Sequence, residues 1–501
     1  MTWNLVFEHL FIVLASGLLS ILIGLPFGIA AYAFPRTRGL ILRVVDLLQT
    51  IPSLALLGIL LVFFGAGKGT VIVGITLYSL LPIVRNTCLG LQEVDPGVKE
   101  AARGMGMSRS YRILRIELPL AFPTVFTGIR IAVVNAIGSA VFAAFVGGGG
   151  LGSVINQGIR VQDMTLILSA TAALMVIAVL LDCLMGAFER SVRKRKGGSR
   201  KLWLGAAAVA AAFIALLPFG MNSSEGLILY DGDYSETQLM HHMVKLLVEE
   251  KTDLSVTILD QMSQVNNFKA LADGSCDLMI SYDGTLLTTF LHLDPTDVPA
   301  GQSIYDYANA VAGEQYDMRL LEKLGFDNTY AVAVPAHIME TYQFRTVSDL
   351  AASAPQLRFG AEQGFFSQEG SMKYGPFTDF YGLAFQEAIS VDQGLKYAAV
   401  ENGSFDVTVV YATDGLNRKA GLQILEDDRG FFPDYNGAFL VRNDTFEKFR
   451  DEAPELEAVL NLLSGRISTE QMAELTYQVD VLGRTVDDVA MEFLQSEGLL
   501  G

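Results

Sequence analysis

The residue types that usually perform catalysis or hold metals are few in this chain of 501 residues, and their spacing suits neither task. Among the five histidines, His241 and His242 are adjacent, whereas a helical metal site uses ligands four positions apart. The three cysteines, Cys88, Cys183 and Cys276, form no Cys-x-x-Cys pair. We therefore expect no metal site and no enzymatic activity, and we expect the chemistry of this chain to be binding.

One short segment carries a Gly-Lys pair that resembles part of a phosphate-binding loop. Residues 65–70 read Gly-Ala-Gly-Lys-Gly-Thr, but Val62 stands where that motif has its first glycine. No other segment fits the motif. We predict that the chain carries no cofactor and that any ATP is bound by a separate partner subunit.

The segment from residue 100 to residue 119 is a basic, polar island between two long apolar runs. Glu100, Ala101 and Ala102 favour the start of a short helix with small side chains, which a second protein can approach closely. Gly106 permits a sharp turn before the next helical piece. The residue types leave two interpretations open, a docking surface for a partner or a linker between two membrane helices.

The spacing in this segment, named here the coupling segment, resembles the cytoplasmic coupling loop of importer-type ATP-binding-cassette (ABC) permeases. The family pattern is Glu-Ala-Ala, then Gly after three residues, then Ile-x-Leu-Pro after nine more. The matching positions here are Glu100, Ala101, Ala102, Gly106, Ile116, Leu118 and Pro119. The resemblance implies that a cytoplasmic ABC ATPase subunit docks on the coupling segment. It also implies that two copies of the chain pair as a homodimer, because permeases of that family work as dimers.

Charge divides the chain into two halves of different kinds. Residues 1–220 carry 19 Lys and Arg against 9 Asp and Glu, a balance of +10. Residues 221–501 carry 17 against 45, a balance of −28, and the two balances add to the −18 of the whole chain. We expect a membrane half followed by a soluble acidic half. The acidic half argues against a nucleic-acid partner, because phosphate binding needs a basic face.

Six apolar runs have the length that a membrane-spanning helix needs. They cover about Leu10–Phe34, Ile41–Phe64, Val71–Leu89, Val125–Val146, Thr165–Phe188 and Leu202–Phe219. Lys and Arg concentrate in the connections that follow the first, third and fifth runs. The positive-inside rule therefore predicts a multi-pass protein of the bacterial cell membrane, surrounded by lipid, with its N-terminus and its C-terminal half outside and the coupling segment in the cytoplasm.

Two membrane segments narrow the resemblance to permeases of osmoprotectant importers. Residues 46–57 read Asp-Leu-Leu-Gln-Thr-Ile-Pro-Ser-Leu-Ala-Leu-Leu, and residues 81–87 read Leu-Pro-Ile-Val-Arg-Asn-Thr. Asp46 and Arg85 lie near the cytoplasmic edge of neighbouring spans, where we expect them to form an ion pair. The residues leave open whether this pair is functional or purely structural.

The soluble half alternates short apolar strands with helical segments. Strands are expected at residues 227–230, 256–259, 278–280, 330–334, 358–360 and 406–411, and a helix at 237–251. This pattern predicts an α/β architecture of two lobes with a ligand in the cleft between them. With the resemblance, the expected fold class is multidomain: an all-α polytopic MetI-like ABC permease joined to an α/β two-lobed domain of the type II periplasmic-binding-protein kind.

The expected domain boundaries follow from these patterns. Residues 1–190 form a permease domain of five spans, and residues 191–226 form a basic loop, the sixth span and a linker. An extracytoplasmic substrate-binding domain covers residues 227–501, with lobe 1 at about 227–331 and 413–501 and lobe 2 at about 332–412. The short linker would hold the binding domain near the permease at an effective concentration on the order of millimolar.

Four loop segments resemble the binding-site segments of extracytoplasmic glycine betaine, choline and carnitine binding proteins. They are residues 282–285, 328–331, 411–415 and 425–436, and each contributes a tyrosine. The resemblance implies that Tyr282, Tyr330, Tyr411 and Tyr435 form an aromatic cage for a quaternary ammonium group. Such a group cannot use hydrogen bonds, whereas cation–π attraction is worth ~2 kcal/mol or more once water is excluded. For any one tyrosine, packing with the hydroxyl in water is the alternative.

The resemblance implies further substrate-binding positions. They are Glu236, Thr237, Asp283, Thr285 and Asp414. Three positions depart from the family: Thr237 replaces Gln, Asp283 replaces Thr, and Ser367 replaces a common Arg. These departures put recognition of a plain carboxylate in doubt. Asp283 would instead meet a second cationic or donor group, such as the imidazole-type ring of a betaine like ergothioneine.

The resemblance thus implies that one polypeptide combines the permease and the substrate-binding subunit of an ABC importer for quaternary ammonium compounds such as glycine betaine, choline or carnitine. Two alternatives stay open. The first is an importer of the same architecture for ergothioneine or another amino-acid-like ligand. The second is a membrane receptor that senses a ligand without transporting it, although a receptor has no use for an ATPase docking surface.

Overall fold

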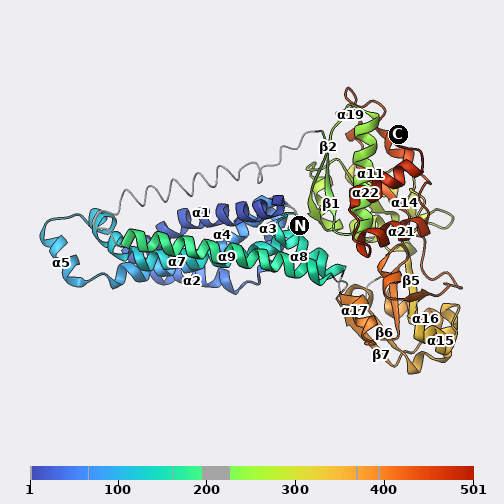
Figure 1. The fold of residues 1–501 in the computed structure, drawn as a ribbon, viewed down its shortest axis with the longest axis horizontal. Coiled ribbons are helices and arrows are strands. Elements are labelled where there is room, and N and C mark those ends of the chain that lie inside the picture. The colour runs from blue at the N-terminus through green and yellow to red at the C-terminus, as the bar shows by residue number, and fades with distance from the viewer. Residues whose placement is uncertain (1–2, 66, 162, 194–225, 368–369, 393–394) are drawn as a thin grey trace. The chain divides into compact units, whose positions relative to one another are not determined.

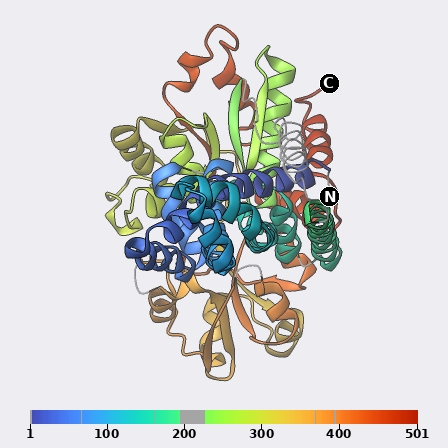
Figure 2. The same ribbon diagram turned by 90° about the vertical axis from the view of Figure 1, so that its left-hand side faces the viewer.

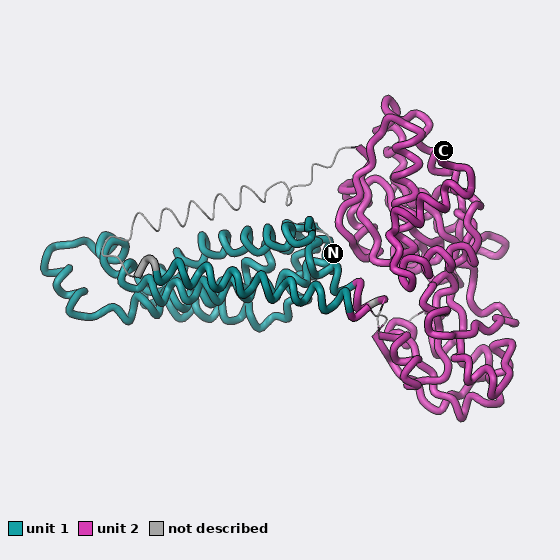
Figure 3. The backbone as a smooth tube through the Cα atoms, viewed as in Figure 1, with its two compact units in different colours: residues 1–156, 165–223 teal, residues 157–164, 224–501 magenta. Residues whose placement is uncertain are grey.

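The computed structural model describes residues 3–65, 67–161, 163–193, 226–367, 370–392 and 395–501. The chain separates into two compact units, coloured teal and magenta in Figure 3. The first comprises residues 1–156 and 165–223, and the second comprises residues 157–164 and 224–501. The predicted sixth span, Leu202–Phe219, with most of its basic loop and linker, lies outside the described residues.

The first unit is a bundle of long apolar helices (Figure 1). Its helices are α1 (Trp3–Ala33), α2 (Pro35–Thr50), α3 (Ser53–Phe64), α4 (Lys68–Glu93), α5 (Pro96–Gly104), α6 (Arg109–Arg112), α7 (Leu118–Ser139), α8 (Leu151–Arg160) and α9 (Met164–Arg193), with a π-helical turn at Ile113–Glu117 and a 3-10 helix at Ala140–Val146. In the described part of the chain, four helical segments can cross a membrane: Trp3–Ala33, Lys68–Glu93, Arg109–Val146 and Met164–Arg190. They coincide with the first, third, fourth and fifth predicted runs, and the chain is an integral membrane protein.

The second predicted span, Ile41–Phe64, is not one straight helix. Helices α2 and α3 meet at an angle of 100°. Ile51 at the break has extended backbone with φ −73° and ψ 126°, because the ring of a following proline clashes with a helical residue before it. Pro52 also lacks the N–H that would continue the helix. The apolar run therefore forms two helices that only together have the length of a span.

Small residues let the membrane helices pack closely. A Cβ atom added at Gly28 of α1 would lie 2.5 Å from Cβ of Thr87 on α4, and one added at Gly128 of α7 would lie 2.5 Å from the carbonyl oxygen of Pro82.

An ion pair joins α4 to α2. Nη2 of Arg85 lies 2.7 Å from Oδ2 of Asp46, which confirms the predicted pair.

The second unit has two lobes, which Figure 2 shows in mainly green and red for lobe 1 and in orange for lobe 2. Lobe 1 contains a parallel pair, β1 (Leu227–Gly232) and β2 (Val256–Met262), and an antiparallel sheet of β3 (Leu278–Tyr282), β10 (Gly437–Arg442) and β4 (Met318–Leu320) in the order β3-β10-β4. Its helices are α11 (Ser235–Lys251), α12 (Gln264–Ala272), α13 (Asp283–Thr285), α14 (Ile304–Tyr316), α19 (Thr445–Lys448), α20 (Leu456–Leu460), α21 (Thr469–Asp480) and α22 (Val486–Ser496).

Lobe 2 contains one mixed sheet in the order β7-β6-β8-β5-β9. Its strands are β5 (Tyr330–Pro335), β6 (Arg358–Glu362), β7 (Glu387–Val391), β8 (Val407–Tyr411) and β9 (Leu422–Ile424). The accompanying helices are α15 (Ala336–Tyr342), α16 (Tyr374–Tyr381), α17 (Lys396–Glu401) and α18 (Leu416–Lys419). The six predicted strands and the predicted helix at 237–251 are all present, and this mixed α/β fold confirms the expected class.

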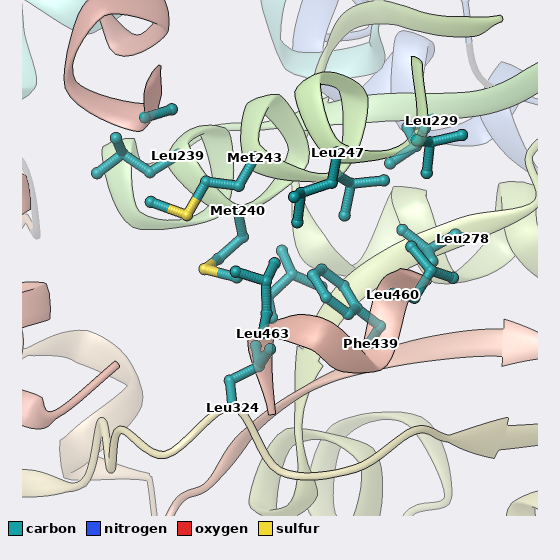
Figure 4. Close-up of a cluster of buried hydrophobic side chains, with 14 of the residues drawn as sticks. Leu229, Leu239, Met240, Met243, Leu247, Leu278, Leu324, Phe439, Leu460 and Leu463 are labelled. Carbon is teal, nitrogen blue, oxygen red and sulfur yellow. The ribbon is translucent and has the colours of Figure 1, made fainter. Parts of the chain in front are cut away.

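Successive side chains of a strand point to opposite faces of the sheet, and both faces are buried under other parts of the lobe. In β3, Leu278 and Ile280 join the core beneath α11, whereas Met279 between them joins a separate core on the opposite face. Figure 4 shows the first of these cores, with Met240, Met243 and Leu247 of α11 packed towards the sheet residues. Burial on both faces explains why the strand sequences are continuously apolar.

Lobe 2 continues further along the chain than the expected end at residue 412. Strand β9 pairs with β5, and Phe432 packs in the lobe 2 core. The chain returns to lobe 1 only between Phe432 and Gly437, where β10 begins. Because β9 has three residues, it is too short to give a periodic signal in the sequence.

Candidate functional site

A cavity of about 760 Å³ lies between the two lobes of the second unit. Its wall includes six tyrosines: Tyr234, Tyr282 and Tyr435 from lobe 1, and Tyr330, Tyr397 and Tyr411 from lobe 2. Tyr330 begins β5, the first strand of lobe 2, and Tyr411 ends β8, the strand paired with it. The cavity therefore lies where the chain passes between the lobes.

The four tyrosines expected to form a cage lie as two stacked pairs. Rings of Tyr282 and Tyr435 have centroids 5.6 Å apart at an interplanar angle of 28°, and those of Tyr330 and Tyr411 are 5.0 Å apart at 27°. Each pair comes from one lobe. Burial raises the pKa of all four hydroxyls, so they stay neutral over the physiological range. The arrangement presents neutral aromatic surface on two sides of the cavity.

Glu236 is the central carboxyl group of this site. It accepts hydrogen bonds from the hydroxyls of Tyr282 and Thr413 and from Nδ2 of Asn328, the last at 3.1 Å. Burial raises the pKa of Glu236 to about 7, although its hydrogen bonds to Thr413 and Tyr282 oppose the rise. Asn328 comes just before β5 and Thr413 just after β8, so one titratable carboxyl group ties the end of this strand pair to lobe 1.

Two further predicted positions line the cavity and are held by specific hydrogen bonds. The hydroxyls of Thr285 and Tyr435 are 2.7 Å apart. Asp414 accepts from the Tyr397 hydroxyl at 2.5 Å and from the backbone N–H of Leu416 at 2.9 Å. Both side chains fix the direction of a neighbouring tyrosine.

Asp283 and Thr237 do not line the cavity. The carboxylate of Asp283 is buried and accepts from the backbone N–H groups of Gly284 and Asn436 and from Nδ2 of Asn436. Burial raises the pKa of Asp283 to about 6. The Thr237 hydroxyl donates to the carbonyl oxygen of Tyr234 at 2.7 Å. In this structure the oxygens of Asp283 serve the loop that carries Tyr435, and its contact with a second ligand group stays a prediction.

Lys396 and Tyr397 also line the cavity, although no sequence signal pointed to either residue. Lys396 is buried, its Nζ lies 2.5 Å from Oε1 of Glu362, and it donates to the carbonyl oxygen of Val409 at 3.1 Å. The same ammonium lies 5.3 Å from the ring centroid of Tyr397 and 5.6 Å from that of Tyr411. The α17 helix that positions both residues has no motif of its own, so only the fold places them here.

Charges around the cavity favour a cation. Among the described lining residues are five carboxylic acids (Glu236, Asp294, Asp297, Asp414 and Asp480) against two lysines (Lys373 and Lys396), and no arginine. Ser367, at the position where the resemblance places a common Arg, lines the cavity. A region with this excess of carboxylates attracts a positively charged ligand. In the described part of the chain no group of three His, Cys, Asp or Glu side chains is placed to hold a metal ion.

In the first unit, the coupling segment presents an exposed surface. Helix α5 carries Glu100 and Ala101 outward and buries Ala102. Gly106 has φ +75°, a left-handed conformation that glycine adopts without strain. Further along, Ile116 and Leu118 are half-buried and Pro119 is exposed. The segment therefore combines residues open to a partner with residues fixed in the helix bundle.

Comparison with known families divides the chain in the same way. Residues 228–496 match OpuAC, the substrate binding domain of ABC-type glycine betaine transport systems. Residues 20–194 match the inner membrane component of binding-protein-dependent transport systems. The first match covers the second unit and the second match covers the helix bundle.

Individual relatives cover either one half or the whole chain. The ergothioneine transport permease/ergothioneine binding protein EgtU of Helicobacter pylori (strain G27) is 29% identical over 498 residues, which are 97% of this chain and 88% of that protein. The glycine betaine/carnitine/choline transport system permease protein OpuCB of Bacillus subtilis (strain 168) is 36% identical over 37% of this chain and 85% of its own length. The carnitine transport binding protein OpuCC of Listeria monocytogenes is 31% identical over 52% of this chain and 83% of its own length.

Proposed function

Because the chain belongs to the family of ABC importers for glycine betaine, carnitine and choline, with permease and substrate-binding domain fused in one polypeptide, we propose that its cavity binds a quaternary ammonium compound. The six tyrosines around one carboxylate-rich cavity carry this proposal. A trimethylammonium group offers neither donors nor acceptors, so aromatic faces and negative charge are the means of holding it. The stacked pairs Tyr282–Tyr435 and Tyr330–Tyr411 supply the faces, and Glu236 supplies charge when ionised.

Ergothioneine is the second candidate ligand. A relative that matches almost the whole chain is named for this compound, which joins a trimethylammonium group to a sulfur-bearing imidazole-type ring. The cavity of about 760 Å³ leaves room beyond a trimethylammonium group. Gln264, Ser371 and Lys373 line it as well and offer hydrogen bonds to a polar ring or a carboxylate.

The permease half is proposed to move this ligand inward at the expense of ATP. A separate cytoplasmic ATPase subunit would dock on the coupling segment, and two copies of the chain would form the transport unit. The second unit would then lie outside the cell, where it captures the ligand and delivers it to the permease. The exposed Glu100 and Ala101, on a helix joined to the membrane bundle, support such a docking role.

Calorimetric titration of the full-length chain in lipid nanodiscs tests the ligand. The titrants are choline, glycine betaine, carnitine, proline betaine and ergothioneine, with glutamine as an amino acid without a quaternary nitrogen. We expect at least one of the first five to bind and glutamine not to bind. Binding of glutamine alone would contradict the quaternary ammonium assignment.

Uptake separates an importer from a receptor. Proteoliposomes containing the full-length chain and the ATPase that co-purifies with it should accumulate the bound compound only when ATP is supplied on the ATPase side. Binding without ATP-dependent uptake would favour the receptor instead.

A further inference from the structure

The coupling segment and the membrane helix α7 form one continuous helical rod. Residues Arg109–Val146 form a single helical segment of 38 residues, which includes α6, the π-helical turn Ile113–Glu117 and α7. A displacement of the exposed part of the segment can therefore be transmitted to α7 through continuous helical backbone. The π-helical turn separates the α-helical segments α6 and α7 of this route, and α7 also contains Pro123, which lacks a backbone N–H. Such turns occur often at functional sites, and they are places where helices bend.

A buried ion pair spans the π-helical turn. Nε of Arg112, just before the turn, lies 2.6 Å from Oε1 of Glu117, its last residue. The Glu117 side chain is fully buried, and that of Arg112 is 11% exposed. Residues five apart point to different sides of an α-helix, whereas the wider π turn aligns them. The backbone N–H of Leu118 donates to the carbonyl oxygen of Ile113, which is the five-residue hydrogen bond of that turn. The π turn thus brings the two charges of the ion pair to the same side of the helix.

The Arg112–Glu117 pair is poorly explained as a contribution to the stability of the fold. Two charges lose their hydration on burial, and apolar side chains of the same volume usually stabilise a protein as well or better. A buried pair does, however, select one geometry, because removing either charge leaves the other without a partner. The pair therefore favours the π turn over a regular α-helical continuation or a bend.

Lys99, just before the coupling segment, and Arg109 within it attach this part of the chain to the neighbouring helices. Nζ of Lys99 donates to the carbonyl oxygens of Leu91 and Gln92 at the end of α4, at 2.8 and 3.0 Å. Arg109 donates to the carbonyl oxygen of Ala33 at the end of α1. The Arg109 contact holds the start of the rod, while the Arg112–Glu117 pair fixes the angle between α6 and α7.

We propose that the Arg112–Glu117 ion pair locks the π-helical turn, so that the coupling segment and α7 move as one lever when the ATPase subunit moves. Arg112 and Glu117 are positioning residues in this role and touch neither ligand nor nucleotide. The inference rests on the proposed function, because it requires an ATPase subunit on the coupling segment. Its specific consequence is that breaking the pair separates ATP hydrolysis from transport.

The test compares Glu117→Gln with Glu93→Gln in proteoliposomes. Both variants remove one carboxylate near the same end of the bundle, but Glu93 is exposed at the end of α4. ATP hydrolysis and uptake are measured together, with whichever of choline, glycine betaine, carnitine, proline betaine or ergothioneine binds most tightly as the probe. We expect Glu117→Gln to lower the uptake per ATP hydrolysed by about tenfold, with hydrolysis retained, because the unpaired Arg112 releases the turn. Glu93→Gln should leave this ratio unchanged.

The exchanged variant Arg112→Glu with Glu117→Arg restores opposite charges and should recover part of the ratio, which a general loss of folding would not do. If Glu117→Gln does not accumulate in the membrane, Glu117→Asp keeps the charge but shortens its reach and should lower the same ratio. An unchanged ratio in Glu117→Gln, or in Glu117→Asp where it takes its place, overturns the lever. So does a proportional loss of hydrolysis and uptake. If the unmodified chain retains no ATPase during purification, the proposed function itself fails, which is a distinct result.

Discussion

Tyr330 and Tyr411 are direct partners across the antiparallel strands β5 and β8, and their hydroxyl oxygens are 3.3 Å apart. Their rings stack with centroids 5.0 Å apart. The register of two backbone strands, and not a flexible loop, therefore sets this half of the proposed cage. Tyr282 ends β3 opposite Gly437, and Tyr435 lies in the loop just before Gly437, so both stacked pairs lie at the ends of paired strands.

Removing one tyrosine ring should weaken ligand binding without unfolding the lobe. We expect Tyr411→Ala to raise the Kd for the bound quaternary ammonium compound roughly thirtyfold, which corresponds to the ~2 kcal/mol of a desolvated cation–π contact. Tyr411→Phe keeps the ring and should change the Kd much less. Calorimetry on the full-length chain measures both. Equal losses in the two variants would show that the hydroxyl, and not the ring, matters.

Gly284, beside the cage, allows Tyr435 to be displaced without changing the tyrosine itself. A Cβ atom at Gly284 would lie 2.1 Å from Cε2 of Tyr435, so Gly284→Ala must displace that ring. Overpacking of this kind costs about 1–3 kcal/mol, and we expect weaker ligand binding with a lower Tm. Gly375→Ala is the matched control, because a Cβ atom there meets nothing within 4 Å. Unchanged binding in Gly284→Ala would exclude Tyr435 from the site.

Local patterns in the sequence were sufficient for much of the fold. Continuous apolar runs indicated the membrane helices, and short apolar runs indicated strands that are buried on both faces, such as β3 and β8. The break at Ile51 and Pro52 had a local signal, since proline disfavours a helical residue before it. Strand β9 had no local signal in the sequence, because its three residues form a strand only by pairing with β5.

The site was harder to predict from the sequence than the fold, because tertiary packing brings several of its residues together. Four tyrosines were identified because each lies in a segment that resembles known binding proteins, and all four line the cavity. Lys396 and Tyr397 come from α17, and only tertiary packing brings them beside Tyr411. The direction of Asp283 was likewise decided by Asn436, 153 positions away in the chain. Side-chain direction at a loop depends on such distant partners.

Ligand affinity should depend on pH through Glu236. The pKa of this carboxyl group is raised to about 7 in the folded chain without ligand, so it is largely protonated at pH 6 and largely ionised at pH 8. A quaternary ammonium group nearby favours the ionised form and lowers this pKa. Binding should therefore release a proton, and the affinity should rise roughly fivefold to tenfold from pH 6 to pH 8.

Calorimetry in buffers of different ionisation enthalpy measures both the affinity and the proton release. Glu236→Gln keeps one oxygen that can accept from Tyr282 and Asn328, replaces the oxygen that accepts from Thr413 with an amide group, and does not titrate, so its affinity should vary little over this range. Because the folded pKa lies above the ordinary value of 4.5, the contribution of Glu236 to the free energy of unfolding of the unliganded chain is present below pH 4.5 and is lost as the pH rises from 4.5 through about 7. A pH dependence that persists in Glu236→Gln would assign the effect to another group.

The turn of the coupling segment offers a matched pair of glycine substitutions. Gly106 has φ +75°, where alanine costs about 1–2 kcal/mol, whereas Gly104 ends α5 without a positive φ and a Cβ atom there meets nothing within 4 Å. We expect Gly106→Ala to distort the surface around Glu100 and Ala101, and so to lower ATP-dependent uptake and retention of the ATPase subunit. Ligand affinity should be unaffected, because the cavity belongs to the other unit. Gly104→Ala should behave as the unmodified chain. Equal uptake and equal ATPase retention in the two variants would show that the coupling segment is a linker and that the ATPase docks elsewhere.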